Sequence, residues 1–175
     1  GPHLIKDGFH FADWLALDND VPGPFGATDP LFVASAYYYK DASILSASAR
    51  ILGKIEDEKI YGDLAEEIIA DIRNTYYDKE GLCVCDTQTG SAISIMFRLN
   101  PSEEARIREG AALVAKINAN NGYLNTGFVG TTMLCPALTE TGHSDKAMNL
   151  LLNEEYPGWL YSVKMGATTI WERWN

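Results

Sequence analysis

The sequence predicts an all-α protein whose antiparallel helical hairpins form part of an (α/α)6 toroid. Apolar residues recur at three- and four-residue steps over several long stretches, which is the period of a helix with one buried face. Nearly uncharged helices alternate with charged ones along the chain. No segment shows sustained period-two alternation, so we expect no extensive sheet.

A first hairpin is predicted between residues 31 and 77. Its second helix, from about Asp57 to Tyr77, combines an apolar stripe with many acidic residues, and Gly81 lies in the turn beyond it. Gly53 separates the two helices and is placed as a helix stop. The apolar positions of the first helix are Leu31, Ala34, Tyr38, Ala42, Leu45, Ala49 and Leu52.

Two further hairpins follow. An apolar helix is expected from Thr87 to Leu99, and the run Asn100-Pro101-Ser102-Glu103 opens the next helix with a cap, a proline and an acid in its first turn. The third hairpin is expected from Thr126 to about Thr141 and from Ser144 to about Glu155. Pro136 should kink its first helix because proline lacks the donor that a helix interior needs.

The two helices of each hairpin differ in charge, and this difference predicts two layers. The first members carry almost no charge, whereas the second members are rich in Asp, Glu, Lys and Arg. A helix that is apolar nearly all round is buried on most sides, and an amphipathic helix covers an outer surface. An open solenoid of the tetratricopeptide kind is the alternative, but the hairpins lack its fixed period.

Each predicted inner helix begins in small and hydroxyl residues. The three segments are Gly26–Asp29, Asp86–Gly90 and Asn125–Thr131, and the tail repeats the first of them as Gly166-Ala167-Thr168-Thr169. A fourth inner helix is therefore expected to start at this repeat. Some of the threonines are helix caps, but caps alone need no neighbouring glycines, which permit a ligand to approach the backbone closely.

The charge balance limits the possible partners. The formal net charge of -10 argues against nucleic acid, which is bound by clustered Lys and Arg, and a neutral substrate fits better. No apolar run is long enough to cross a bilayer, so no membrane partner is expected. No signal peptide is recognisable, which favours a cytoplasmic location, although Gly1-Pro2 resembles a protease scar and is compatible with a lost signal.

The three cysteines, Cys83, Cys85 and Cys135, are interpreted as free thiols. They cannot all pair with one another, and a disulfide between Cys135 and one of the other two is the less favoured alternative. The Cys83-Val84-Cys85 spacing does not match a zinc site. We therefore expect no metal and no cofactor.

Aromatic residues gather around two carboxylates. Trp171 and Trp174 flank Glu172 in the tail, and Asp13 precedes Trp14 near the start of the chain. Sugars present apolar C–H faces as well as hydroxyl groups, so this composition suits a carbohydrate pocket. The alternative is that the tryptophans belong to the core and that Glu172 lies on an ordinary charged helix surface.

Several segments resemble α-L-rhamnosidases. The tail, from Tyr156-Pro157-Gly158-Trp159 through Gly166-Ala167-Thr168-Thr169-Ile170-Trp171-Glu172-Arg173-Trp174, resembles a segment characteristic of this family. Asn125–Thr131, the Ala36-Tyr37-Tyr38 helix and Ala12-Asp13-Trp14, where the family often has Gly-Asp-Trp, are similar too. The matching segments follow one another in the family's order over nearly the whole chain.

The resemblance implies inverting hydrolysis of terminal α-L-rhamnose from a glycoside or oligosaccharide. One carboxylic acid protonates the leaving oxygen, and a second carboxylate activates a water on the opposite face of the sugar. Glu172 matches the family's general base, and Trp14 matches a segment that supplies an aromatic wall to the rhamnose pocket. The substrate-binding candidates are Trp14, Asp13, Thr126, Trp171 and Trp174.

Two parts of the family pattern are missing. Nothing matches the upstream Asp-Cys-Pro type motif that carries the general acid, and a sugar-binding histidine beyond the tail is also absent. Residues 1–175 are therefore expected to be the C-terminal part of a six-hairpin (α/α)6 catalytic domain, truncated at both ends and inactive alone. Uncovered inner helices favour self-association.

Two other functions stay open at this point. The chain could be a helical-repeat binding module, or another glycosidase or lyase on the same toroid, because a fold does not fix a function. The rhamnosidase interpretation makes two geometric predictions. Trp14 and Glu172 should lie at the same end of the helical layer, and Glu172 should face an open cavity from the first turn of its helix.

Overall fold

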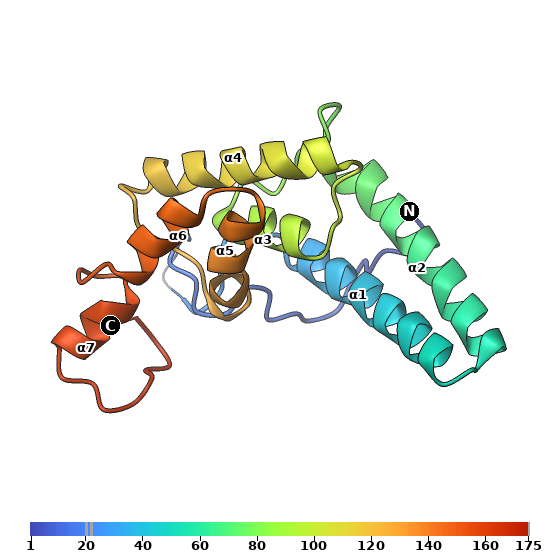
Figure 1. The fold of residues 1–175 in the computed structure, drawn as a ribbon, viewed down its shortest axis with the longest axis horizontal. Coiled ribbons are helices and arrows are strands. Elements are labelled where there is room, and N and C mark those ends of the chain that lie inside the picture. The colour runs from blue at the N-terminus through green and yellow to red at the C-terminus, as the bar shows by residue number, and fades with distance from the viewer. Residues whose placement is uncertain (20, 22, 175) are drawn as a thin grey trace.

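A computed structural model of the chain describes residues 1–19, 21 and 23–174, and these residues contain helices and no strand (Figure 1). An isolated antiparallel bridge joins Tyr77 to Cys83 between two of the helices. The helices are α1 (Pro30–Ile51), α2 (Ile55–Tyr76), α3 (Gln88–Met96), α4 (Glu103–Ala119), α5 (Phe128–Glu140), α6 (Ser144–Leu151) and α7 (Trp159–Lys164).

The first predicted hairpin is formed by the long helices α1 and α2 (Figure 1). The Asp29 side chain caps α1 by accepting a hydrogen bond of 2.8 Å from the Leu31 N–H, and Pro30 occupies the first turn, where its missing donor costs nothing. Gly53 has a φ of +69° in the turn between the helices, which explains why a glycine stands there.

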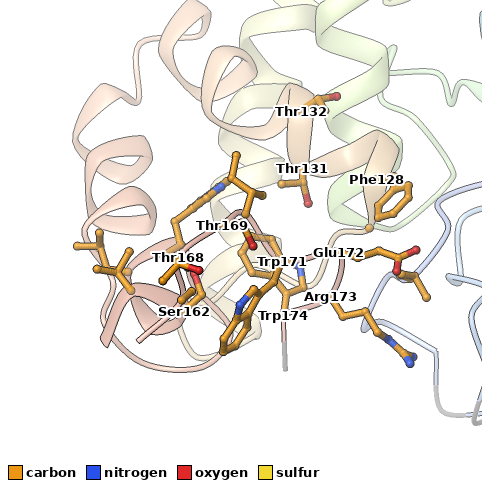
Figure 2. A pocket seen from close by; sticks show the side chains of 17 residues that line it. Phe128, Thr131, Thr132, Ser162, Thr168, Thr169, Trp171, Glu172, Arg173 and Trp174 are labelled. Atoms are coloured by element: carbon orange, nitrogen blue, oxygen red, sulfur yellow. Dashed lines mark hydrogen bonds between the residues drawn. The ribbon is translucent and has the colours of Figure 1, made fainter. Parts of the chain in front are cut away.

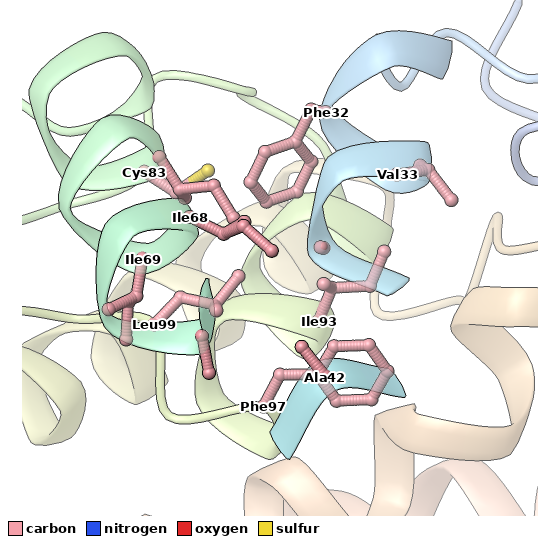
Figure 3. Packing of buried hydrophobic residues seen from close by; sticks show 12 residues of the cluster. Phe32, Val33, Ala42, Ile68, Ile69, Cys83, Ile93, Phe97 and Leu99 are labelled. Atoms are coloured by element: carbon pink, nitrogen blue, oxygen red, sulfur yellow. The ribbon is translucent and has the colours of Figure 1, made fainter. Parts of the chain in front are cut away.

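The core of this hairpin extends to α3. Side chains of α1, α2 and α3 interlock in one buried cluster with Cys83 and Leu99 from the neighbouring loops (Figure 3). Its apolar members in the three helices are Phe32, Val33, Ala36, Ala42, Ala65, Ile68, Ile69, Ile72 and Ile93. Burial of each of the Phe, Val and Ile side chains stabilises the fold by about 1.5–3 kcal/mol, before the entropy of ordering them is counted.

The second and third hairpins share another core. α3 and α5 pack against each other under α4, with α6 beyond α5 (Figure 1). Thr87 caps α3 through the Gly90 N–H at 2.9 Å, and Ser102 caps α4 through the Ala105 N–H at 3.2 Å. Every residue of α3 from Gln88 to Ile95 is buried, as predicted for an inner helix.

The entrances of the three inner helices meet at one end of the molecule. The Thr28 hydroxyl, just before α1, lies 2.7 Å from the Thr87 hydroxyl at the start of α3. Thr89, in the first turn of α3, and the Gly127 N–H, at the start of α5, both donate to the Asp13 carboxylate. The N-termini of these helices and the loops that precede them therefore lie close together.

The prediction of a fourth inner helix that starts near Gly166 is wrong for the residues that the structure describes. Gly166, with a φ of +86°, ends the short helix α7, which the sequence did not predict, and residues 167–174 are irregular. The N–H groups of Gly166 and Ala167 bond back to Val163 and Ser162, which is a Schellman motif.

The last predicted helix also ends earlier than expected, at Leu151 instead of about Glu155. The Asn153 side chain accepts a hydrogen bond from the Glu155 N–H at 3.1 Å and donates to the Glu155 carbonyl at 2.7 Å. Asparagine side chains form such turns in competition with a helix. Gly53 and Gly81 stand in turns with positive φ, as the sequence indicated, and Gly142 does so between α5 and α6.

Other expectations concern membranes and thiols. Within residues 1–19, 21 and 23–174, no helix combines the length and apolar character that crossing a membrane requires.

Cys83, Cys85 and Cys135 are free thiols, which agrees with the preferred interpretation of the sequence.

An exposed apolar stripe runs along α1 and leads to a prediction about self-association. Its members repeat every seven residues, so they share one helix face, and they are Tyr37, Tyr38, Ile44, Leu45, Ile51 and Leu52. In a closed toroid the neighbouring hairpin would cover this face. Without that hairpin, we expect concentration-dependent dimers or larger species in sedimentation velocity, because water-exposed apolar stripes associate.

A matched pair of variants tests the stripe. Ile51, which is 84% exposed and on the stripe, and Ile60, which is 60% exposed on α2, are each changed to lysine. Ile51→Lys should shift the chain toward monomer, and Ile60→Lys should leave the association unchanged. A parent chain that stays monomeric at every concentration contradicts the prediction.

Candidate active site

A cavity of about 1010 Å³ lies beside the start of α5 (Figure 2). Its walls come from the start of α5, from α7, from the irregular tail after Gly166 and from Leu15. The lining is mostly apolar and aromatic, with hydroxyl groups interspersed. The hydroxyl-bearing members are Thr131, Thr132, Ser162, Thr168 and Thr169.

Tryptophans organise the tail side of the cavity. The rings of Trp159 and Trp174 meet edge to face at a centroid distance of 5.3 Å, and the Trp174 Nε1–H donates to the Thr126 carbonyl at 3.2 Å. This bond anchors the irregular tail to the entrance of α5. Trp171, which is 37% exposed, lines the same cavity and offers it an aromatic surface.

Glu172 lines the cavity and its side chain is exposed, beside Phe128 at the start of α5 (Figure 2). This is not the enclosed glutamate expected of a core position, so the open-cavity prediction agrees with the structure. The residue does not stand in the first turn of a helix, because the tail that carries it is irregular. Its position depends instead on the Trp174 anchor two residues later.

Trp14 lies next to the cavity and belongs to an aromatic cluster. Its half-buried ring packs edge to face against Phe11 and Phe25, with centroids 5.2 Å away in both cases. Its carbonyl accepts a hydrogen bond of 2.9 Å from the Phe128 N–H. Because Phe128 and Glu172 line one cavity, Trp14 and Glu172 lie at the same end of the helical layer, as predicted.

Asp13 and Thr126 lie behind the wall, not on it. Both side chains are fully buried, and neither residue lines the cavity. The Asp13 carboxylate accepts hydrogen bonds from protein groups of α3 and α5, and the Thr126 hydroxyl lies 2.8 Å from that of Thr131. The structure therefore gives these two candidates contacts with the protein where the sequence suggested contacts with the sugar.

The sequence missed several lining residues. Thr131, Thr168 and Thr169 belong to the hydroxyl-rich helix entrances, so that signal could have identified them. Leu15 and Phe128 gave no comparable signal, because an apolar residue in a loop reads the same whether it lines a cavity or covers a core.

Burial changes the titration of two groups near this end. It raises the pKa of Asp18; a hydrogen bond from the Ala27 N–H opposes the rise, and the charge of Asp13 adds to it. Burial also raises the pKa of Tyr37, with smaller contributions from Asp13 and Asp41. Within the part of the chain that the structure describes, no three His, Cys, Asp or Glu residues form a group that could hold a metal ion.

Comparison with known proteins identifies the family. Residues 3–175 match the bacterial α-L-rhamnosidase six-hairpin glycosidase domain. The chain belongs to this family. Its predicted all-α fold, with hairpins that form part of an (α/α)6 toroid, is thereby confirmed.

Relatives in sequence support the same conclusion. The chain is 37% identical over 167 residues to an α-L-rhamnosidase of Formosa agariphila, a match that covers 94% of this chain and 18% of that protein. It is 34% identical over 174 residues to an α-L-rhamnosidase of Streptomyces avermitilis, with 98% of this chain and 16% of that protein covered. The chain thus spans less than a fifth of the length of these two relatives.

Solved structures agree as well. The α-L-rhamnosidase of Aspergillus terreus superposes with a TM-score of 0.89 at 33% identity, over 96% of this chain and 20% of that one. The Streptomyces avermitilis enzyme complexed with L-rhamnose gives a TM-score of 0.87 at 34% identity, over 100% of this chain and 16% of that one.

The backbone at residue 12 disfavours the alanine found there and gives a prediction. Ala12, where α-L-rhamnosidases often have glycine, has a φ of +51°, in the left-handed region. Ala12→Gly should raise the free energy of unfolding by about 0.5–1 kcal/mol, since this region costs a residue with a Cβ roughly 1–2 kcal/mol and glycine's greater freedom when unfolded offsets part of the gain. Urea denaturation measures the change.

The control is the same substitution in a regular helix. Ala47 is exposed in α1, so Ala47→Gly should lower the free energy of unfolding by about 0.5–1 kcal/mol. If Ala12→Gly destabilised the chain as much as Ala47→Gly, the left-handed backbone at residue 12 would not be the reason for the family's glycine.

Proposed function

We propose that this chain is part of a glycoside hydrolase that removes terminal α-L-rhamnose by an inverting mechanism, with Glu172 as general base and the general acid outside residues 1–175. Family membership and the rhamnose complex of a structural neighbour support the substrate class. The observation that carries the mechanism is the exposed Glu172 carboxylate on a cavity of about 1010 Å³ with aromatic walls.

The cavity has the chemistry that a rhamnose ring needs. Rhamnose is a 6-deoxy sugar, so it presents a methyl group and C–H faces together with its hydroxyls. The exposed part of Trp171, with Leu15 and Phe128, offers apolar surface to the former. Hydroxyl groups such as those of Thr131 and Thr169 can exchange hydrogen bonds with the latter.

Glu172 can act as base because it borders open space. In an inverting enzyme the base takes a proton from water as that water attacks the anomeric carbon, and roughly 6.5–9.5 Å separates the two carboxyl groups to make room for the water. A carboxylate at the edge of a large open cavity can hold such a water, whereas an enclosed and paired glutamate could not.

Trp14 and Trp174 have separate tasks in this proposal. Trp14 extends the aromatic wall beyond Leu15, and Trp174 fixes the tail through its bond to the Thr126 carbonyl. The residues of the three hairpins supply one side of the site, and the other hairpins of the toroid supply the acid. Without an acid to protonate the leaving oxygen, the 175-residue chain should not hydrolyse rhamnosides, because general-acid help contributes orders of magnitude.

Replacement of the proposed base tests the mechanism. In a rhamnosidase that contains this segment, Glu172→Gln keeps the size of the side chain but cannot accept the proton from water. We expect kcat on an aryl rhamnoside to fall by about 10²–10⁴, with a much smaller change in KM because the ring contacts remain.

Glu154→Gln is the matched control, since Glu154 is exposed near the same tail but does not line the cavity. It should leave kcat unchanged. A Glu172→Gln enzyme that hydrolyses at nearly the parental rate while folded would remove the base assignment and leave the cavity as a binding site without chemistry.

A further inference from the structure

We propose that Asp13 is a positioning residue, whose buried carboxylate clamps the loop of Trp14 and Leu15 to the first turns of α3 and α5 and so holds the cavity in shape. The inference rests on the proposed function, because the cavity that the clamp shapes is the proposed rhamnose site. Asp13 itself does not touch the cavity and is fully buried.

The carboxylate accepts four hydrogen bonds. Oδ1 accepts from the N–H groups of Val129 at 2.8 Å and Gly130 at 3.0 Å. Oδ2 accepts from the Gly127 N–H at 2.8 Å and from the Thr89 hydroxyl. A buried charge is tolerated only when its lone pairs are satisfied in this way, and hydrogen bonds to a charged acceptor are about twice as strong as neutral ones.

This arrangement replaces a local helix cap. α1, α3 and α4 are each capped by their own neighbouring side chain, from Asp29, Thr87 and Ser102 respectively. The N-cap of α5 is Gly127, which has no side chain to do this. The Asp13 carboxylate, more than a hundred residues earlier in the chain, therefore accepts hydrogen bonds from the free N–H groups of α5. It also lies at the positive end of the α5 dipole.

The start of α5 lies so close to the Trp14 loop and to Thr89 that no side chain would fit between them. A Cβ on Gly127 would lie 2.2 Å from the Trp14 carbonyl oxygen, and a Cβ on Gly130 would lie 2.1 Å from the Thr89 hydroxyl oxygen. Leu15, next to Trp14, has a φ of +64°, which a residue with a side chain adopts only when its surroundings hold it there. The clamp at Asp13 helps to hold it, together with the hydrogen bond of 2.6 Å from the Leu15 N–H to the Pro24 carbonyl.

Both walls of the cavity are connected to the clamp. On one side, Leu15 lines the cavity two residues from Asp13, and Phe128 follows Gly127 directly. On the other side, the Thr126 carbonyl accepts the Trp174 Nε1–H at 3.2 Å, which anchors the tail that carries Glu172. Loss of the clamp should therefore loosen the walls before it unfolds the helices.

The tryptophans make this directly measurable. The chain has four, and Trp159, Trp171 and Trp174 line the cavity while the Trp14 carbonyl bonds to Phe128 at its edge. Tryptophan fluorescence of the 175-residue chain therefore reports on the cavity, whereas far-UV circular dichroism reports on the helices.

Asp13→Asn is the test variant. An amide has one acceptor oxygen, so its NH₂ must face one pair of donors. The orientation that loses fewer hydrogen bonds places the NH₂ group at the Oδ2 position. There the Thr89 hydroxyl can rotate and accept a hydrogen bond from the amide, but the Gly127 N–H loses its acceptor. We expect tryptophan emission at longer wavelength, stronger quenching by acrylamide, and about tenfold weaker binding of L-rhamnose in fluorescence titration.

Glu109→Gln is the matched control for a purely structural effect. The Glu109 carboxylate is also fully buried and accepts from the Cys83 N–H at 2.8 Å, the Ser91 hydroxyl at 2.6 Å and the Asn100 amide at 3.3 Å, and none of these residues lines the cavity. Glu109→Gln should lower the melting temperature yet leave tryptophan emission and quenching unchanged.

The two variants are compared at equal distances below their melting temperatures. If Asp13→Asn changes emission and quenching no more than Glu109→Gln does, the clamp is only a stabilising contact and the proposal is overturned. If the parent chain does not bind L-rhamnose, the proposed function loses support, but the comparison of emission still decides the role of Asp13.

A milder variant covers the case in which Asp13→Asn does not fold. Thr89→Val removes one of the four donors and keeps both the carboxylate and the side-chain shape. It should shift emission and quenching in the same direction by a smaller amount. Unchanged tryptophan signals in folded Thr89→Val would overturn the proposal in the same way.

Discussion

The buried carboxylate of Asp13 is the interaction on which the geometry of the candidate site depends. It joins the N-terminal loop to the first turns of α3 and α5, and three of its four donors are backbone N–H groups of or beside α5. A carboxylate in this position interacts favourably with the positive end of the helix dipole. It also accepts hydrogen bonds from backbone N–H groups that have no partner within the helix. The loop and the first turns of α3 and α5 therefore meet at one buried group.

Two helical layers provide the frame for that contact. The inner helix α3 is buried over nearly its whole length, and its neighbours α1 and α5 enter from the same end. Glycines at Gly127 and Gly130 allow the loop and the helices to approach, where any side chain would collide with backbone or hydroxyl atoms. Beside this close approach lies the cavity, whose walls combine the start of α5 and helix α7 with Leu15 and the irregular tail.

The α1 stripe and the cavity are two consequences of one architecture. A toroid of six hairpins buries both sides of every inner helix, and the three hairpins of this chain leave one side of α1 exposed. The cavity carries one proposed catalytic carboxylate, Glu172, and the proposed acid would come from another part of such a toroid. In the proposed function, neighbouring hairpins of a complete toroid would both cover the apolar stripe and supply the acid.

Periodicity in the sequence determined the hairpins, the inner and outer layers and most helix ends, because the pattern of apolar residues, caps and turn glycines acts over a few residues. The tail motif also indicated the family and made Glu172 the candidate base. Only the tertiary structure decided that Asp13 and Thr126 stand behind the wall, that Leu15 and Phe128 form it, and that the segment after Gly166 is irregular. The physical reason is distance along the chain: the donors to Asp13 from α5 lie more than a hundred residues away, and no local pattern records a contact that folding alone creates.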